Sequence, residues 1–70
     1  MEKVNVSSTN ISSVQYNESD ESMVLEFKNG SSYKYKDVPL MVYKAFLTSS
    51  SKGQFFHSDI KRSFECVKLN

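Results

Sequence analysis

The sequence predicts an α+β fold in which two helices pack on one face of a small antiparallel sheet. Three observations predict it: short alternating apolar runs in the first half, an Asn-Gly pair between two of them, and apolar residues at helical spacing from residue 38 onward. The expected element order is β-β-β-α-α-β, and a further short strand at 3–6 is left open. Seventy residues allow one domain over 1–70, in which residues 1–6 either pair with the sheet or fray.

Alternation predicts three strands, at residues 11–16, 23–28 and 31–36. In each strand an apolar or aromatic residue recurs at every second position, which places these residues on one face. The acidic connection at 17–22 is expected to lie in solvent. The residues expected on the shared apolar face are Val14, Tyr16, Met23, Leu25, Phe27, Tyr33 and Tyr35.

The loop at Asn29 and Gly30 decides which residues share a face. A two-residue loop would set Leu25 opposite Lys34, so the apolar face of one strand would meet the charged face of the next. A three-residue loop, with a left-handed Gly30 at a bulge, sets Leu25 opposite Tyr33. We predict the three-residue loop. The opposite face is then expected to carry Val24, Glu26, Lys28, Lys34 and Lys36.

Helical spacing follows the Tyr-rich strand. Asp37 is the expected N-cap of the first helix, and Pro39 is tolerated in a first turn because its missing N–H loses little there. The helix is expected to end near residues 48–51. Its inner stripe is expected to contain Val38, Leu40, Val42, Tyr43, Ala45, Phe46 and Leu47.

A second helix is expected from Ser51, because Gln54 three residues later completes a capping-box pattern. Phe56 and Ile60 lie four residues apart and are expected on its inner side. Residues 63–69 alternate again and predict the last strand.

Composition places the chain among ordinary globular domains, with 39% hydrophobic and 24% charged residues. The single cysteine, Cys66, excludes an intramolecular disulfide and is expected to be half-buried near the last strand. No signal peptide opens the chain, and no apolar run approaches the ~18 residues of a membrane span. We therefore expect a cytoplasmic protein with no membrane partner.

Charge is unevenly distributed along the chain. Residues 1–27 hold one base and five acids, whereas residues 28–70 hold eight bases and three acids, although the formal net charge is only +1. Such a split can create a basic surface. A solvated sheet face whose lysines discourage edge pairing is the alternative interpretation. The candidate nucleic-acid-binding residues are Lys34, Lys36, Lys52, Lys61 and Arg62, with an edge-exposed Tyr35 or Tyr43 for base stacking.

A candidate anion site lies at the start of the second helix, at Ser51, Lys52 and Gly53. Free backbone N–H groups, hydroxyls, a glycine and a lysine together are typical of phosphate sites. An ordinary N-cap followed by a chain reversal explains the same residues. The segment lacks the glycine pattern of a P-loop, so no NTPase is implied.

Catalysis and metal binding have little support. His57, Ser58 and Asp59 lie too close together on one helix to form a triad. One histidine and one cysteine cannot fill a tetrahedral metal site unless several carboxylates converge on it. We therefore expect no enzymatic activity, no cofactor and no metal.

Three segments resemble a known family when taken in order: SSTNISSVQY (7–16), FKNGSSYKYKDVP (27–39) and VYKAFLTSSSKGQFFHSDI (42–60). The most specific part is Tyr33-x-Tyr35 followed by Val38 and Pro39. Together they resemble the KTSC domain, which is named for its occurrence at the C-terminus of some lysyl-tRNA synthetases. Free single-domain members occur in bacteria and phages. The resemblance implies a link to RNA through the synthetase fusion, but no activity.

Two functions follow as hypotheses. The leading one is a small non-catalytic module that binds RNA or another nucleic acid through its basic side. The alternative is a phage-type module that binds a host protein or sequesters a small nucleotide. Homo-oligomers are a further expectation, because a domain of this size gains stability by association.

Overall fold

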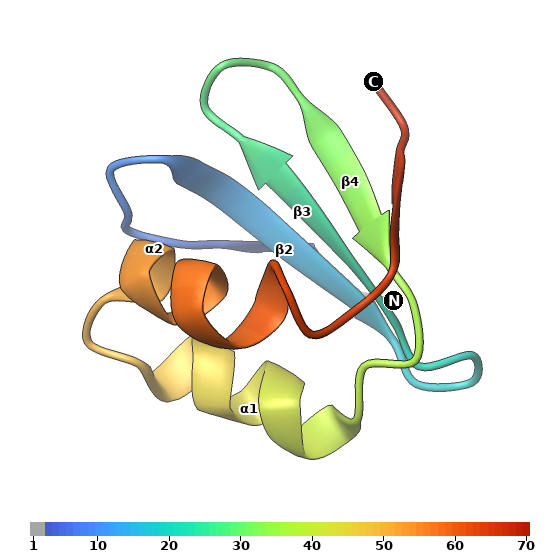
Figure 1. Cartoon of the computed structure of the whole chain (residues 1–70). Coiled ribbons are helices and arrows are strands. Elements are labelled where there is room, and N and C mark those ends of the chain that lie inside the picture. The colour runs from blue at the N-terminus through green and yellow to red at the C-terminus, as the bar shows by residue number, and fades with distance from the viewer. Residues whose placement is uncertain (1–2) are drawn as a thin grey trace.

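The computed structural model describes residues 3–70, which form a five-stranded antiparallel sheet with helices on one face (Figure 1). The strand order is β1-β2-β3-β4-β5, so the predicted α+β class is confirmed, and the short N-terminal strand that was left open is part of the sheet. The first two residues of the segment expected to pair or fray lie outside the described residues. The elements are β1 (Lys3–Asn5), β2 (Ile11–Asn17), β3 (Ser22–Phe27), β4 (Ser32–Tyr35), α1 (Leu40–Thr48), α2 (Lys52–Phe55), the π-helical turn η1 (Phe56–Ile60) and β5 (Cys66–Lys68).

The β3–β4 hairpin has the predicted register, with Leu25 opposite Tyr33. Its three-residue loop is closed by two backbone hydrogen bonds. The N–H of Phe27 donates to the carbonyl of Ser31 at 2.8 Å, and the N–H of Gly30 donates to the carbonyl of Phe27 at 3.0 Å. Gly30 has a φ of 94°, the left-handed conformation that the bulged loop requires.

The core lies between the helices and one face of the sheet. Tyr16 joins the two layers, because its hydroxyl donates to the carbonyl of Val38 at 2.6 Å. Its ring also stacks on Tyr43 of α1, with 4.6 Å between ring centroids and 9° between ring planes. The fully buried apolar residues are Ile11, Val14, Met23, Leu25, Val38, Phe46 and Ile60.

The start of α1 differs from the prediction. Pro39 occupies the N-cap position instead of Asp37, and no side chain caps the helix. Asp37 has a φ of 56°, in the left-handed region that Asp tolerates better than most residues. The N–H of Val38 donates to the carbonyl of Glu21 at 2.7 Å, so Val38 is fixed to the β2–β3 turn and the helix begins after it. Ala45, predicted on the inner stripe, is exposed.

The second helical segment changes type along its length. Ser51 is its N-cap residue, as predicted, but its side chain makes no capping hydrogen bond, so the predicted capping box is not formed. Instead, the N–H of Ser51 donates to the hydroxyl of Ser49 at 3.2 Å. Phe56 and Ile60, both in η1, are buried, as predicted. The last strand is shorter than predicted, because β5 pairs with β4 only over Cys66–Lys68.

Candidate functional site

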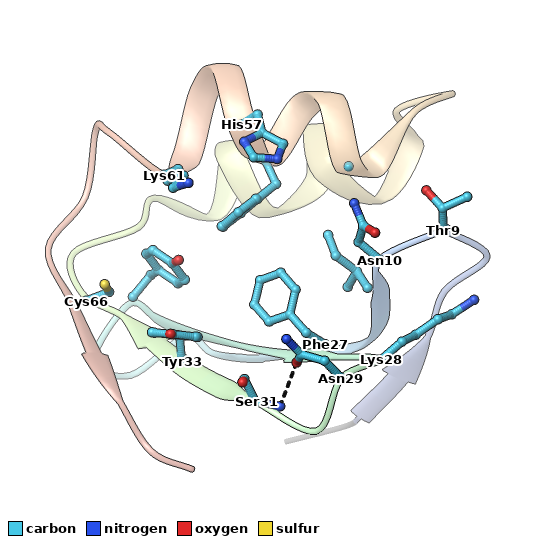
Figure 2. A pocket seen from close by; sticks show the side chains of 14 residues that line it. Thr9, Asn10, Phe27, Lys28, Asn29, Ser31, Tyr33, His57, Lys61 and Cys66 are labelled. Atoms are coloured by element: carbon cyan, nitrogen blue, oxygen red, sulfur yellow. Dashed lines mark hydrogen bonds between the residues drawn. The ribbon is translucent and has the colours of Figure 1, made fainter.

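A cleft of about 800 Å³ lies between the β3–β4 hairpin and the α2–η1 segment (Figure 2). Clefts of ~300–1,000 Å³ with apolar walls and a few polar groups are the usual form of ligand sites. In Figure 2, His57 and Lys61 extend from the helical side, and Phe27 and Tyr33 belong to the sheet side. The apolar wall consists of Ile11, Phe27, Tyr33, Tyr35 and Phe56. The polar groups include Asn10, Lys28, Asn29, His57, Lys61 and Cys66.

The aromatic rings of the cleft form a connected cluster. Phe27 meets Tyr33 and Phe56 edge to face, at centroid distances of 5.9 and 5.3 Å. Phe56 meets Tyr35 in the same way at 5.7 Å. Such contacts stabilise ring pairs beyond the area that they bury. Phe27 and Tyr33 are only half-buried, so part of each ring surface remains available to a ligand.

Tyr35 belongs to the buried part of this cluster, with 3% of its surface exposed. Burial raises the pKa of its hydroxyl to about 12, and the nearby Cys66 thiol adds to the shift. The expectation that Tyr35 offers an edge-exposed ring for base stacking is therefore wrong, because its ring packs against Phe56 in the core. Tyr43, the other ring proposed for stacking, is half-buried and stacked on Tyr16.

Lys28 lines the cleft, although it was predicted on the opposite face of the sheet. Lys28 is the first residue of the three-residue loop. The alternation of β3 therefore ends at Phe27 and does not determine the face of the sheet on which the Lys28 side chain lies. The N–H of Lys28 donates to the carbonyl of Asn10 at 2.8 Å, which joins the hairpin loop to the β1–β2 loop. The side-chain oxygen of Asn29 accepts a hydrogen bond from the N–H of Ser31 at 2.9 Å and stabilises the loop (Figure 2).

The structure does not bring the predicted basic residues together on one surface. Lys61 lines the cleft. Lys34 lies on the open face of the sheet, because it alternates with Tyr33 and Tyr35, which face the helices. Its amino group is 3.9 Å from the carboxylate of Asp20. Lys36 and Arg62 are exposed and do not line the cleft.

A polar cavity of about 750 Å³ lies between the β1–β2 loop and the start of α2. The residues of the predicted anion site, Ser51, Lys52 and Gly53, all line it. Because α2 has only four residues, side-chain hydroxyls and the lysine give this cavity its polar character, in place of a long helix dipole. The amino group of Lys52 donates to the carbonyl of Ser49 at 3.1 Å, which holds the lysine beside the cavity.

Of the residues that the two cavities share, sequence reasoning singled out Gly53, as part of the anion site, but missed the others as cavity-lining residues. His57 is exposed, and its ring lies beside Phe56 at 5.6 Å and lines both cavities. The sequence signal that was available for His57 is its position directly after Phe56, which was predicted to face inward. Nothing in the sequence placed Asn10 beside Lys28, because that contact depends on how the β1–β2 loop folds back.

Other chemical features of the described chain are limited. Within residues 3–70, no three potential ligands among His, Cys, Asp and Glu come together to hold a metal ion. In the same range, no helix is long and apolar enough to cross a membrane. Cys66 was expected to be half-buried but is exposed, because it lies in the outermost and very short β5.

The sequence matches the family model of the KTSC domain over residues 7–64. The chain belongs to the KTSC domain family. This KTSC domain is 38% identical over 60 residues to a lysine–tRNA ligase from Nostoc sp., covering 86% of this chain and 11% of the ligase. It is also 31% identical over 64 residues to a protein from Tsukamurella paurometabola, covering 91% of this chain and 96% of that protein.

A solved KTSC domain protein from Yersinia pestis has the same fold, with a TM-score of 0.92 and 33% sequence identity. The likeness covers 99% of this chain and 97% of that one. The family resemblance seen in the sequence is thus confirmed over nearly the whole domain. Because the chain spans only 11% of the length of the Nostoc ligase, the activity of that enzyme is not transferred to it.

Proposed function

We propose that this KTSC domain is a non-catalytic module that binds single-stranded RNA and takes one unstacked base into the aromatic cleft. The cleft itself carries the proposal: it has a volume of about 800 Å³, half-buried aromatic rings and cationic side chains. Bases of single-stranded RNA pack on aromatic rings, and their phosphates contact lysines. A base inside a duplex cannot reach such a cleft without leaving its stack.

The charges around the cleft support an anionic ligand. Lys28 and Lys61 line it, and among residues 3–70 no carboxylate does. The ion pairs of this part of the chain involve Lys3 and Lys34, and neither cleft lysine takes part in one. Positive charge at the cleft is therefore available for phosphate groups.

The similarity to a lysine–tRNA ligase supports RNA over DNA as the ligand class. This support is associational, because similarity in fold does not by itself carry function. The physical support comes from the aromatic cleft and from Lys28 and Lys61, which line it without an ion pair.

Titration of labelled single-stranded RNA, single-stranded DNA and duplex RNA, at about 50 and 200 mM salt, tests the proposal. We expect single-stranded RNA to bind most tightly and its affinity to fall steeply with salt, because phosphate contacts release counterions. The double variant Lys28→Glu/Lys61→Glu should lose at least about tenfold in affinity, because each charge reversal replaces attraction by repulsion. RNA recovered intact after incubation would agree with a non-catalytic role.

The matched control is Lys34→Glu/Lys36→Glu, which makes the same change in net charge outside the cleft. This control should bind RNA more tightly than the cleft variant, and both variants should melt close to the parent protein. Absence of RNA binding at the lower salt concentration would contradict the proposal. A larger loss in the control than in the cleft variant would move the binding surface to the open face of the sheet.

A further inference from the structure

The aromatic cleft and the polar cavity share one wall. The residues that line both are Thr9, Asn10, Lys28, Gly53 and His57. The two spaces therefore adjoin along these residues.

The two spaces differ in chemistry in a way that points to one kind of ligand. The cleft is walled by the rings of Phe27, Tyr33 and Phe56. The polar cavity instead carries hydroxyl, amide and cationic groups, among them Ser7, Ser8, Ser50, Ser51, Lys52 and Gln54. None of the acidic residues in the described part of the chain lines either space. A ligand that fills both has an aromatic part, a hydroxyl-rich part and a negative charge.

We propose that the two spaces form one site for a nucleoside carrying a terminal phosphate, with the base in the aromatic cleft and the ribose and phosphate in the polar cavity. This inference rests on the proposed function and names the RNA unit that the site accepts. Serine and amide side chains suit the ribose hydroxyls, and Lys28 and Lys52 suit the phosphate. A phosphate monoester carries about −1.5 to −2 charges at pH 7, more than the single charge of an internal diester. The same chemistry occurs at the end of an RNA and in a free mononucleotide.

Gly53 lies on the shared wall and allows a matched pair of variants. A Cβ added there meets only the hydroxyl oxygen of Ser8, at 3.9 Å, which is ordinary contact, so Gly53→Ala should leave the site intact. Ser8 lines the polar cavity, so a longer side chain in this direction occupies the space of the ribose and phosphate. Gly53→Leu should therefore exclude the ligand.

Isothermal titration of the four nucleoside 5′-monophosphates and their parent nucleosides tests the inference. We expect at least one monophosphate to bind about tenfold or more tightly than its nucleoside, because charge-assisted contacts to phosphate are strong. Gly53→Ala should keep this preference, and Gly53→Leu should lose it. Because Gly53→Leu also risks unfolding the domain, Lys52→Gln provides a second variant. Lys44→Gln, on an exposed position of α1, is its control.

A second arm compares short single-stranded RNAs with and without a terminal phosphate. A gain from the phosphate on RNA assigns the site to RNA ends, and a gain on free nucleotides alone assigns it to mononucleotides; both support the inference. Equal affinity of nucleoside and monophosphate overturns it, as does an unchanged preference in folded Gly53→Leu and Lys52→Gln. RNA that binds equally with and without a terminal phosphate, together with equal affinity of nucleoside and monophosphate, overturns this inference while the proposed function stands. Nucleotides that bind where no RNA does would contradict the RNA-binding function and leave the phosphate site in place.

Discussion

The two faces of the sheet differ in how their charges are paired. On the open face, Lys3 lies 3.0 Å from the carboxylate of Glu26, and Lys34 lies 3.9 Å from that of Asp20. On the helix-covered side, Lys28 and Lys61 line an aromatic cleft whose described lining contains no acid. Lysines that look equivalent in the sequence thus differ in their surroundings: Lys3 and Lys34 each lie beside a carboxylate, whereas Lys28 and Lys61 line a cleft without one. The position of a lysine relative to a cavity, and to the nearest carboxylate, identifies it as a candidate for ligand binding.

The largest expected difference between the two faces is in how much the truncation of a side chain lowers the free energy of unfolding. Substitutions at two neighbouring residues of β3 test this difference. Leu25 is fully buried on the helix-covered face, whereas Val24 lies half-exposed on the open face. Leu25→Ala should lower the free energy of unfolding by about 2–5 kcal/mol, because it leaves a cavity in the core. Val24→Ala should lower it by less than about 1 kcal/mol, and urea unfolding measures both. Equal losses would show that the open face is covered in solution, for example by a second copy of the domain.

The next largest expected effect is on stability at alkaline pH, which depends on Tyr35. Its pKa is raised from 10.0 to about 12, so folding favours the neutral phenol. This stabilisation is fully present below pH 10 and is lost as the pH rises through about 12. Tyr35→Phe should therefore stay folded to a higher pH than the parent protein in a titration followed by circular dichroism. Tyr33→Phe, at a half-buried ring, is the control; an alkaline midpoint unchanged in Tyr35→Phe would contradict the burial of the phenol.

A smaller loss is expected from the bond between the sheet and the start of α1. The hydroxyl of Tyr16 donates to the carbonyl of Val38 in a buried setting. Tyr16→Phe keeps the ring that stacks on Tyr43 but leaves this carbonyl without its partner, which should cost about 1–2 kcal/mol. Thermal and urea unfolding measure the loss. An unchanged stability would mean that water reaches the carbonyl and replaces the hydroxyl.

The hairpin could be predicted from the sequence because its determinants are local. Alternation in β3 and β4, together with Gly30, leaves one loop length that keeps Leu25 and Tyr33 on the same face, and the structure has that register. The start of α1 could not be predicted in the same way. There a contact to Glu21, distant in the sequence, fixes Val38 and displaces the helix start from Asp37 to Pro39.

The candidate site was predictable only in part, because stretches that lie far apart in the sequence build it. Lys61, Ser51 and Lys52 were singled out by residue type; Lys61 lines the aromatic cleft, and Ser51 and Lys52 line the polar cavity. Lys28 was assigned to the wrong face because it follows an alternating strand, although it is already part of the loop. The approach of the β1–β2 loop to the hairpin, through the bond between Asn10 and Lys28, has no signature within either segment.

The smallest expected effect concerns the ion pair of the open face. Two hydrogen bonds hold the pKa of Glu26 below its usual value of 4.5, the larger contribution coming from Lys3 and the smaller from Ser13. The resulting stabilisation is present above that value and is lost as the pH falls through the lowered pKa. Glu26→Gln should therefore melt slightly below the parent protein at pH 7, because exposed ion pairs contribute little, and the difference should be smaller at pH 3.

Glu18→Gln, in the exposed β2–β3 turn, is the matched control and should match the parent protein at both pH values. The difference caused by Glu26→Gln at pH 7 should also shrink at high salt, because screening weakens exposed pairs. A difference that persists at pH 3 and in salt would come from the hydrogen bond to Ser13 instead of the charge. Lys3 and Lys34 would then interact with their carboxylates more weakly than the distances of 3.0 and 3.9 Å indicate. The cleft would no longer differ from the open face in having lysines without a carboxylate partner.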